Sequence, residues 1–114
     1  MKTYQVVRKN PGELNWDNVP ALLINEVAWN KPADGIEAKA QLCWDESALY
    51  VKLSAKEANI TANRTETLDF PNFDSCLEFF FSPTGDGRYF NIEFNPNCCN
   101  FLGFGTDISH LCRL

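Results

Sequence analysis

Alternating apolar and polar positions predict a β-hairpin between residues 36 and 55. From Ile36 to Trp44 every second residue is apolar, while most of the residues between them are charged or polar. The same alternation returns from Leu49 to Ala55, after the polar turn Asp45-Glu46-Ser47. We therefore expect two half-buried antiparallel strands joined by a short turn, with Trp44 packed in the core.

A second hairpin is predicted between residues 74 and 96. The aromatic-rich segment 74–83 and the segment 88–96 flank Thr84-Gly85-Asp86-Gly87, which has the composition of a tight turn. With the large apolar side chains facing the core, the expected register sets Phe79 opposite Phe90. It also sets Leu77 opposite Ile92.

This expected register determines what the other face of the second hairpin carries. The expected pairs are Phe80 with Tyr89, Glu78 with Asn91 and Cys76 with Glu93, with Asn95 near Asp74. One face of the sheet therefore combines an aromatic pair with a row of carboxylates and amides.

The remaining segments have weaker patterns. We expect a strand at 3–8, a short buried piece at 22–24, an irregular connection at 56–72, and one more strand around 100–105. The sequence shows no internal repeat, low-complexity tract or linker. It predicts one all-β domain over residues 1–114, an antiparallel β-sandwich of about six strands.

Composition and charge exclude several classes of function. The chain has 114 residues, 45% of them hydrophobic, which argues against disorder. Its net charge of −5 makes nucleic acid a poor partner. No apolar run reaches the about 18 residues of a membrane span, and segment 1–10 lacks the apolar part of a signal peptide. We expect no membrane association and a cytoplasmic location, or secretion only if a leader has been removed.

The cysteines predict neither a disulfide framework nor a metal site. There are five of them, none in a C-x-x-C pair, and His110 is the only histidine. We expect free, mostly structural thiols. Cys76 should be unreactive because neighbouring carboxylates disfavour its thiolate, whereas Cys98 and Cys99, beside a turn, should react sooner.

Residues suited to sugar binding gather on the polar side of the second hairpin. Aromatic rings stack on the apolar face of a pyranose, while amides and carboxylates bind its hydroxyl groups. Tyr89, Asn91, Glu93 and Glu78 supply these groups on one face. The alternative is a solvated surface whose amides satisfy the neighbouring backbone.

Other candidate residues lie beside loops. Trp16 and Trp29 are each either an anchor over the edge of the sandwich or a platform for a ligand, and Trp29 has the more polar flank. Glu57 and Arg64 bracket the irregular connection, where they form either a hydrogen-bonding clamp or a surface ion pair.

Enzyme activity is not expected. Glu78 and Glu93 are a carboxylate pair of the kind that glycoside hydrolysis uses, but carboxylates on a small β-sheet more often bind by hydrogen bonds. A nucleophile scheme lacks a base other than His110.

Four segments resemble the bacterial proteins of the family 9 carbohydrate-binding modules. They are 40–44 (AQLCW), 48–53 (ALYVKL), 74–83 (DSCLEFFFSP) and 88–95 (RYFNIEFN). The resemblance implies a β-sandwich of the DOMON type that binds plant-polysaccharide sugars such as xylo- or cello-oligosaccharides, without catalysis and linked to carbohydrate catabolism. The alternative is a structural or protein-interaction β-domain with a degenerate sugar site.

The resemblance also implies site residues, a cofactor and a partner. It places Trp29, Glu57, Arg64, Asn91 and Glu93 near the sugar, and some members of the family hold calcium. Family members normally continue with further strands, so the chain looks shortened at its C-terminal end. Because an open sheet edge needs a cover, we expect a homodimer through the late strands.

Overall fold

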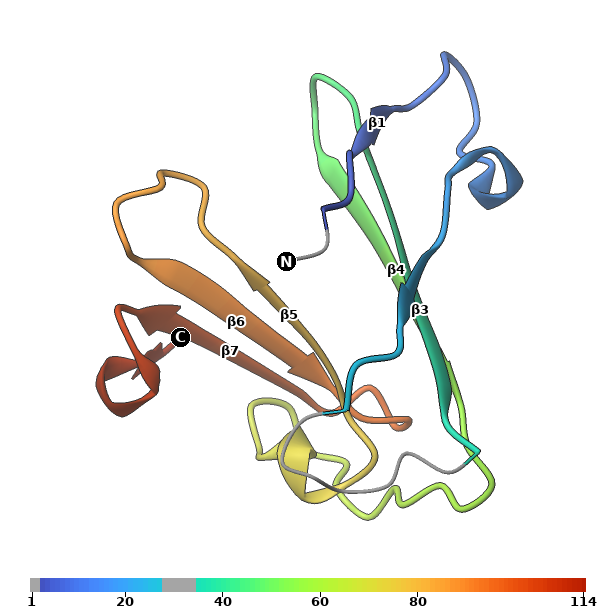
Figure 1. The fold of residues 1–114 in the computed structure, drawn as a ribbon. Helices are drawn as coiled ribbons and strands as arrows, with labels where there is room; N and C mark the ends of the chain where they lie inside the picture. Colours follow the sequence, from blue (N-terminus) through green and yellow to red (C-terminus); the bar gives the residue numbers. More distant parts are fainter. Residues whose placement is uncertain (1–2, 28–34) are drawn as a thin grey trace. The chain divides into compact units, whose positions relative to one another are not determined.

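The computed structural model describes residues 3–27 and 35–114 (Figure 1). Contacts divide the chain into unit 1, Met1–Ala58, and unit 2, Asn59–Leu114. The strands form two four-stranded sheets, one in each unit, and the helices of the described residues are single 3-10 turns. The predicted all-β fold class, with the two sheets that a β-sandwich requires, is confirmed. The described residues include no helix long and apolar enough to cross a membrane.

The sheet of unit 1 is built on the predicted first hairpin. β3 (Glu37–Trp44) and β4 (Leu49–Lys56) pair antiparallel over their full length. β4 pairs with one edge of β3. The other edge of β3 pairs with two short strands, β1 (Val7–Arg8) in parallel and β2 (Leu22–Ile24) in antiparallel orientation. The prediction that 22–24 is buried is wrong, since Leu23 and Ile24 of this edge strand are exposed.

Asp45 shapes the turn of the first hairpin. Its Oδ1 accepts hydrogen bonds from the backbone N–H groups of Ser47 and Ala48, and its Oδ2 accepts one from the Tyr50 hydroxyl. These bonds, led by the one from the Ser47 side chain, lower the pKa of Asp45 to about 2. The turn therefore forms where the sequence places a residue that bonds to its own backbone.

The burial of β3 differs from the predicted pattern. Gln41, on the predicted polar side, is only 8% exposed, whereas Trp44 is 41% exposed. The Gln41 Nε2 donates to the carbonyls of Trp16 and Val19, at 2.9 and 2.8 Å, and so attaches the 3-10 turn η1 (Trp16–Asn18) to β3. The core position predicted for Trp44 is wrong, because the N-terminal segment covers the Gln41 side of the strand instead.

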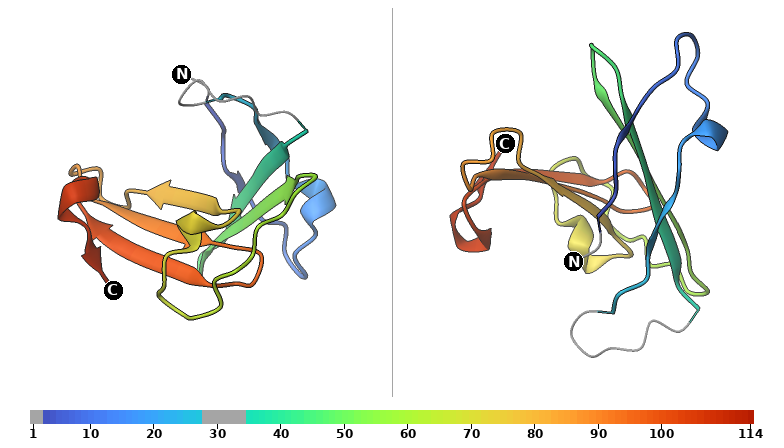
Figure 2. Two further views of the ribbon diagram at one scale, coloured as in Figure 1. Left: turned by 90° about the horizontal axis from the view of Figure 1, so that it is seen from below. Right: turned by 45° about the horizontal axis from the view of Figure 1, so that its top comes forward.

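Unit 2 contains one antiparallel sheet and two 3-10 turns (Figure 2). The strand order is β5-β6-β7-β8, and the predicted second hairpin and the predicted strand around 100–105 are confirmed. The elements are η2 (Pro71–Phe73), β5 (Leu77–Phe81), β6 (Tyr89–Phe94), β7 (Asn100–Gly105), η3 (Ile108–His110) and β8 (Cys112–Arg113).

The predicted register of the second hairpin is wrong by two residues. Phe79 lies opposite Ile92, not Phe90, and Glu78 lies opposite Glu93, not Asn91. The cause is the turn, in which the Asp86 carboxylate accepts both the backbone N–H and the guanidinium of Arg88 and keeps that residue out of the ladder. Because side chains alternate with a period of two, this shift leaves every side chain on its predicted face.

One face of the unit 2 sheet carries a file of phenylalanines. Ring centroids are 5.4 Å apart for Phe79 and Phe81, 5.1 Å for Phe81 and Phe90, and 4.7 Å for Phe90 and Phe104. Such distances are typical of favourable aromatic pairs. This face is the apolar side that the sequence predicts for the hairpin.

The side-chain amide of Asn95 joins three segments of unit 2. Asn95 is 6% exposed, and its Nδ2 donates to the Arg64 carbonyl at 2.7 Å and to Asp74 Oδ2 at 2.9 Å. Its Oδ1 accepts from the backbone N–H groups of Asn97 and Cys99, at 3.0 and 2.9 Å. The predicted proximity of Asn95 and Asp74 is confirmed, and the connecting segment, the start of the hairpin and the β6–β7 turn meet at one residue.

Asp74 also binds the connecting segment, through backbone groups that Asn95 does not contact. Its Oδ2 accepts hydrogen bonds from the backbone N–H groups of Asn63 and Arg64. These bonds, the one from Arg64 first, lower the pKa of Asp74. The irregular connection is therefore fixed by specific polar contacts along 61–75.

We expect Asn95→Ala to lower the free energy of unfolding by on the order of 3 kcal/mol, because it removes the four hydrogen bonds of a buried amide, including the one from the buried Cys99 N–H. Urea denaturation followed by circular dichroism measures this loss. Asn100→Ala is the matched control, since Asn100 makes a single bond of 3.3 Å to the Cys98 carbonyl, and its loss should stay below about 1 kcal/mol. Equal losses for the two variants would show that Asn95 does not join the segments.

Candidate functional site

The face of the unit 2 sheet opposite the phenylalanine file is the candidate site, and we call it the polar face. Alternate residues of the strands point to one side of a sheet, and residues directly opposite one another share that side. The ladders therefore collect on the polar face Cys76, Glu78, Phe80, Tyr89, Asn91, Glu93 and Phe101. The predicted composition of this face is confirmed although its register differs.

Two carboxylates lie side by side in the middle of the polar face. Glu78 and Glu93 are directly opposite, and the Cys76 Sγ and one oxygen of each carboxylate all lie within 4.8 Å of one another. Burial, and then the charge of Glu93, raises the pKa of Glu78. Burial, followed by the charges of Glu78 and Glu93, raises the pKa of Cys76 to about 12.

Asn91 orders the carboxylate next to it. Its side chain is 4% exposed, and its Nδ2 donates to Glu93 Oε1 at 2.8 Å. Its Oδ1 is buried and has no hydrogen-bond partner among the described residues. The amide therefore orients Glu93.

An aromatic pair with one exposed ring lies beside these polar groups, Phe80 on β5 and Tyr89 on β6. The rings of Phe80 and Tyr89 have centroids 5.8 Å apart at an interplanar angle of 51°. Phe80 is 53% exposed and lies directly opposite Asn91. The two rings offer an apolar surface next to hydrogen-bonding groups.

Further rings and a guanidinium lie on the β7 side, and the sequence analysis missed them. Phe101 is opposite Glu93, and Arg113 lies over the Phe101 ring at 5.8 Å and over the Phe70 ring at 4.9 Å. A Cβ atom on Gly103 would come within 2.8 Å of the Phe101 ring, so this glycine lets the ring lie flat against the sheet. In the sequence, Phe101 shares its side of β7 with Gly103 and Gly105, and this pattern could have indicated an accessible ring on the polar face.

The structure brings only part of the predicted site together. Tyr89, Asn91 and Glu93 share the polar face. Arg64 forms an ion pair with Asp69 at 3.2 Å and lies over the Phe73 ring at 5.2 Å. The other two predicted residues, Glu57 and Trp29, are not among the residues that the ladders collect on the polar face. Glu57 belongs to unit 1, one residue after β4, and Arg64 belongs to unit 2, so the predicted clamp between them stays a prediction. Trp29 lies outside the described residues.

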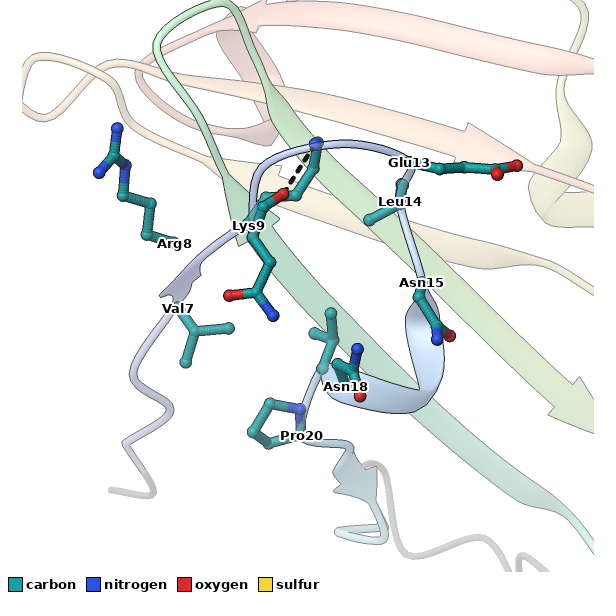
Figure 3. A pocket seen from close by; sticks show the side chains of 10 residues that line it. Val7, Arg8, Lys9, Glu13, Leu14, Asn15, Asn18 and Pro20 are labelled. Carbon is teal, nitrogen blue, oxygen red and sulfur yellow. Dashed lines mark hydrogen bonds between the residues drawn. The ribbon is translucent and has the colours of Figure 1, made fainter.

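Unit 1 contains a pocket of about 260 Å³ near η1 (Figure 3). Aliphatic residues, the amides of Asn10, Asn15 and Asn18, and the charged residues Arg8, Lys9 and Glu13 line it, with no aromatic ring among them. The Lys9 ammonium at its rim already donates to the carbonyls of Asn10 and Gly12. With no ring for stacking, this pocket suits a sugar less well than the polar face.

A family model described as carbohydrate-binding family 9 matches residues 8–113. The chain belongs to this family. The resemblance seen in the sequence is confirmed, and the general function of this family 9 module is carbohydrate binding. A search of curated proteins and a search of solved structures found no match.

Calcium, which the family resemblance implies for some members, stays a prediction. Calcium takes about six to eight oxygen ligands. The one group of three or more potential metal ligands found among the described residues joins the thiol of Cys76 to Glu78 and Glu93. Because one of these ligands is sulfur, this group does not suit calcium.

We expect the five thiols of this family 9 module to react in order of exposure and thiolate content. Cys98 and Cys112 are exposed and should react first with a maleimide at pH 7, and Cys76 should follow slowly because its pKa is raised to about 12. Buried Cys43 and Cys99 should react only on unfolding, so burial now predicts for Cys99 the opposite of the early reaction expected from the sequence. Mass spectrometry of peptides gives the order, and labelling of Cys76 as fast as Cys98 would contradict it.

We expect Glu78→Gln to stabilise the protein at pH 7 by less than about 1 kcal/mol, because this partly exposed charge is screened by solvent. The raised pKa means that the ionised Glu78 costs stability above its folded pKa and costs nothing below the ordinary value of 4.5. The gain should therefore vanish as the pH falls toward 4.5. Urea midpoints across this range test it, with Glu66→Gln as a control for loss of an exposed charge. A gain that persists at low pH would exclude repulsion as its cause.

Proposed function

We propose that this family 9 module binds plant-polysaccharide sugars, such as xylo- or cello-oligosaccharides, on its polar face and acts in carbohydrate catabolism. The observation that carries the proposal is the hydrogen-bonded pair of Asn91 and Glu93 next to the exposed ring of Phe80. Amides and carboxylates bind sugar hydroxyls, and rings stack on the sugar's apolar face.

The polar groups are positioned before a ligand arrives. The bond from Asn91 Nδ2 to Glu93 Oε1 fixes both side chains, which reduces the entropy lost on binding. Glu93 keeps its other oxygen, and the exposed Glu78 carboxylate lies opposite it, so both are acceptors for hydroxyl groups. These acceptors favour a ligand with several neighbouring hydroxyl donors.

The aromatic residues favour a flat sugar ring. β-Linked xylose and glucose units carry equatorial hydroxyls, so their ring faces are apolar and nearly planar. Phe80 and Tyr89 offer such a sugar a stacking surface on one side of the acceptors, and Phe101 offers another on the other side. This arrangement supports recognition of extended β-linked chains over branched, axial sugars.

The two carboxylates support binding without catalysis. Glycoside hydrolysis uses an acid and a second carboxylate that flank the scissile bond from two sides. Glu78 and Glu93 stand at directly opposite positions on neighbouring strands, so both approach a ligand on this face from the same side. We therefore propose a non-catalytic module.

The family resemblance also assigns Trp29, Glu57 and Arg64 to sugar binding, and these assignments stay predictions. For Arg64 the contacts suggest a positioning role, since its guanidinium holds Asp69 while its backbone N–H and carbonyl bond to Asp74 and Asn95. These bonds hold the connecting segment that precedes the polar face.

Isothermal titration calorimetry with xylohexaose and cellohexaose tests the proposal. We expect dissociation constants between about millimolar and micromolar, the range that a few hydroxyl contacts and rings support. Because a hydrogen bond to a charged group is worth about 1.5–3 kcal/mol, Glu93→Gln should weaken binding by roughly tenfold or more.

Two matched variants separate the site from the rest of the surface. Phe80→Ala should also weaken binding, because it removes the exposed stacking ring. Glu66→Gln, which removes one charge from an exposed position of the connecting segment, should leave the affinity unchanged. Unchanged affinity in both Glu93→Gln and Phe80→Ala would exclude the polar face as the site.

A further inference from the structure

The group formed by Cys76, Glu78 and Glu93 has a composition that sugar binding does not require. The Cys76 Sγ and the two carboxylate oxygens lie within 4.8 Å of one another, a distance that one bound ion can bridge. Sugar hydroxyls are bound by oxygen and nitrogen atoms, and a thiol is only a weak hydrogen-bonding group. The sulfur is therefore a reason to consider a metal ion.

Asn91 gives an independent indication of a ligand at the same place. Asn91 is 4% exposed, and its Nδ2 donates to Glu93 Oε1, so its side chain contacts one member of the group. Its Oδ1 is nevertheless unpartnered among the described residues. Buried amide oxygens nearly always have a partner, so this oxygen suggests that a cation or its bound water is the partner.

No ion pair within the described part of the chain neutralises the group. The ion pairs there that involve residues of unit 2 are Arg64 with Asp69, Arg88 with Asp86, and His110 with Asp107. None involves Glu78 or Glu93. Two neighbouring carboxylates without a cation destabilise one another unless an ion binds between them.

We propose that Cys76, Glu78 and Glu93 form a site for a thiophilic divalent metal ion of the zinc class, with the Asn91 Oδ1 accepting from a metal-bound water or binding the ion directly. Zinc takes thiolate and carboxylate ligands, usually about four in total, whereas calcium and magnesium require oxygen ligands. As the metal–sulfur bond forms, the Cys76 thiol releases its proton to solvent.

This inference goes beyond the proposed sugar binding, and it is tested without sugar. The purified 114-residue chain is titrated with Co²⁺ at pH 7.5, because Co²⁺ occupies zinc sites and a thiolate ligand adds a near-ultraviolet charge-transfer band. We expect one equivalent of Co²⁺ to produce that band. Excess Zn²⁺ should remove it, and excess Ca²⁺ should not.

Three variants assign the band to the proposed ligands. Cys76→Ser should abolish it, while Cys98→Ser, which changes an exposed cysteine of the same unit, should leave it intact. Glu78→Gln should weaken Co²⁺ binding by at least about tenfold, the loss typical even of residues that only support a ligand. Far-ultraviolet circular dichroism confirms that each variant is folded.

The proposal is overturned if no band forms, if Cys98→Ser removes it, or if Ca²⁺ displaces Co²⁺ as well as Zn²⁺ does. Sugar binding is measured separately in the presence of a chelator, so the two proposals can fail independently. Sugar affinity in the chelator without a cobalt band would leave the sugar site standing and exclude the metal. A cobalt band without sugar affinity would support the metal site and exclude sugar binding on the polar face.

Discussion

The hydrogen bonds of the buried Asn95 amide are the constraint on which the architecture of unit 2 depends. Through Arg64, Asp74 and the Asn97–Cys99 turn, this one side chain joins the connecting segment, the start of the second hairpin and the β6–β7 connection. Since these segments are far apart in sequence, their alignment costs chain entropy that local propensity does not recover. Once they are aligned, β6 is held between β5 and β7, and the positions on the polar face follow.

The register of β5 and β6 has a direct chemical consequence. It sets Glu78 against Glu93 with Cys76 beside them, an arrangement that raises the pKa of Glu78 and of Cys76 because the charged forms are close together and partly buried. A sheet selected only for stability would avoid such a pair. Local conflicts of this kind are typical of functional sites, which agrees with the family's carbohydrate-binding role.

Unit 1 shows a different use of a polar side chain. Gln41 lies within a strand whose alternation suggests an exposed position, yet it is buried because its amide satisfies two carbonyls at the ends of the η1 turn. Buried backbone carbonyls need partners, and here a strand side chain supplies them. The same sheet leaves Trp44 exposed, with Arg8 over its ring at 5.8 Å.

The sequence by itself determined the two hairpins, the strand around 100–105 and the composition of the polar face, because side chains alternate with a period of two and Tyr89, Asn91 and Glu93 share one parity. Only the folded structure decided the register, since a shift of two residues preserves the alternating pattern on which the sequence prediction rests. It also decided which polar residues are buried, because burial of Gln41, Asn91 and Asn95 depends on partners from distant segments that no local pattern encodes.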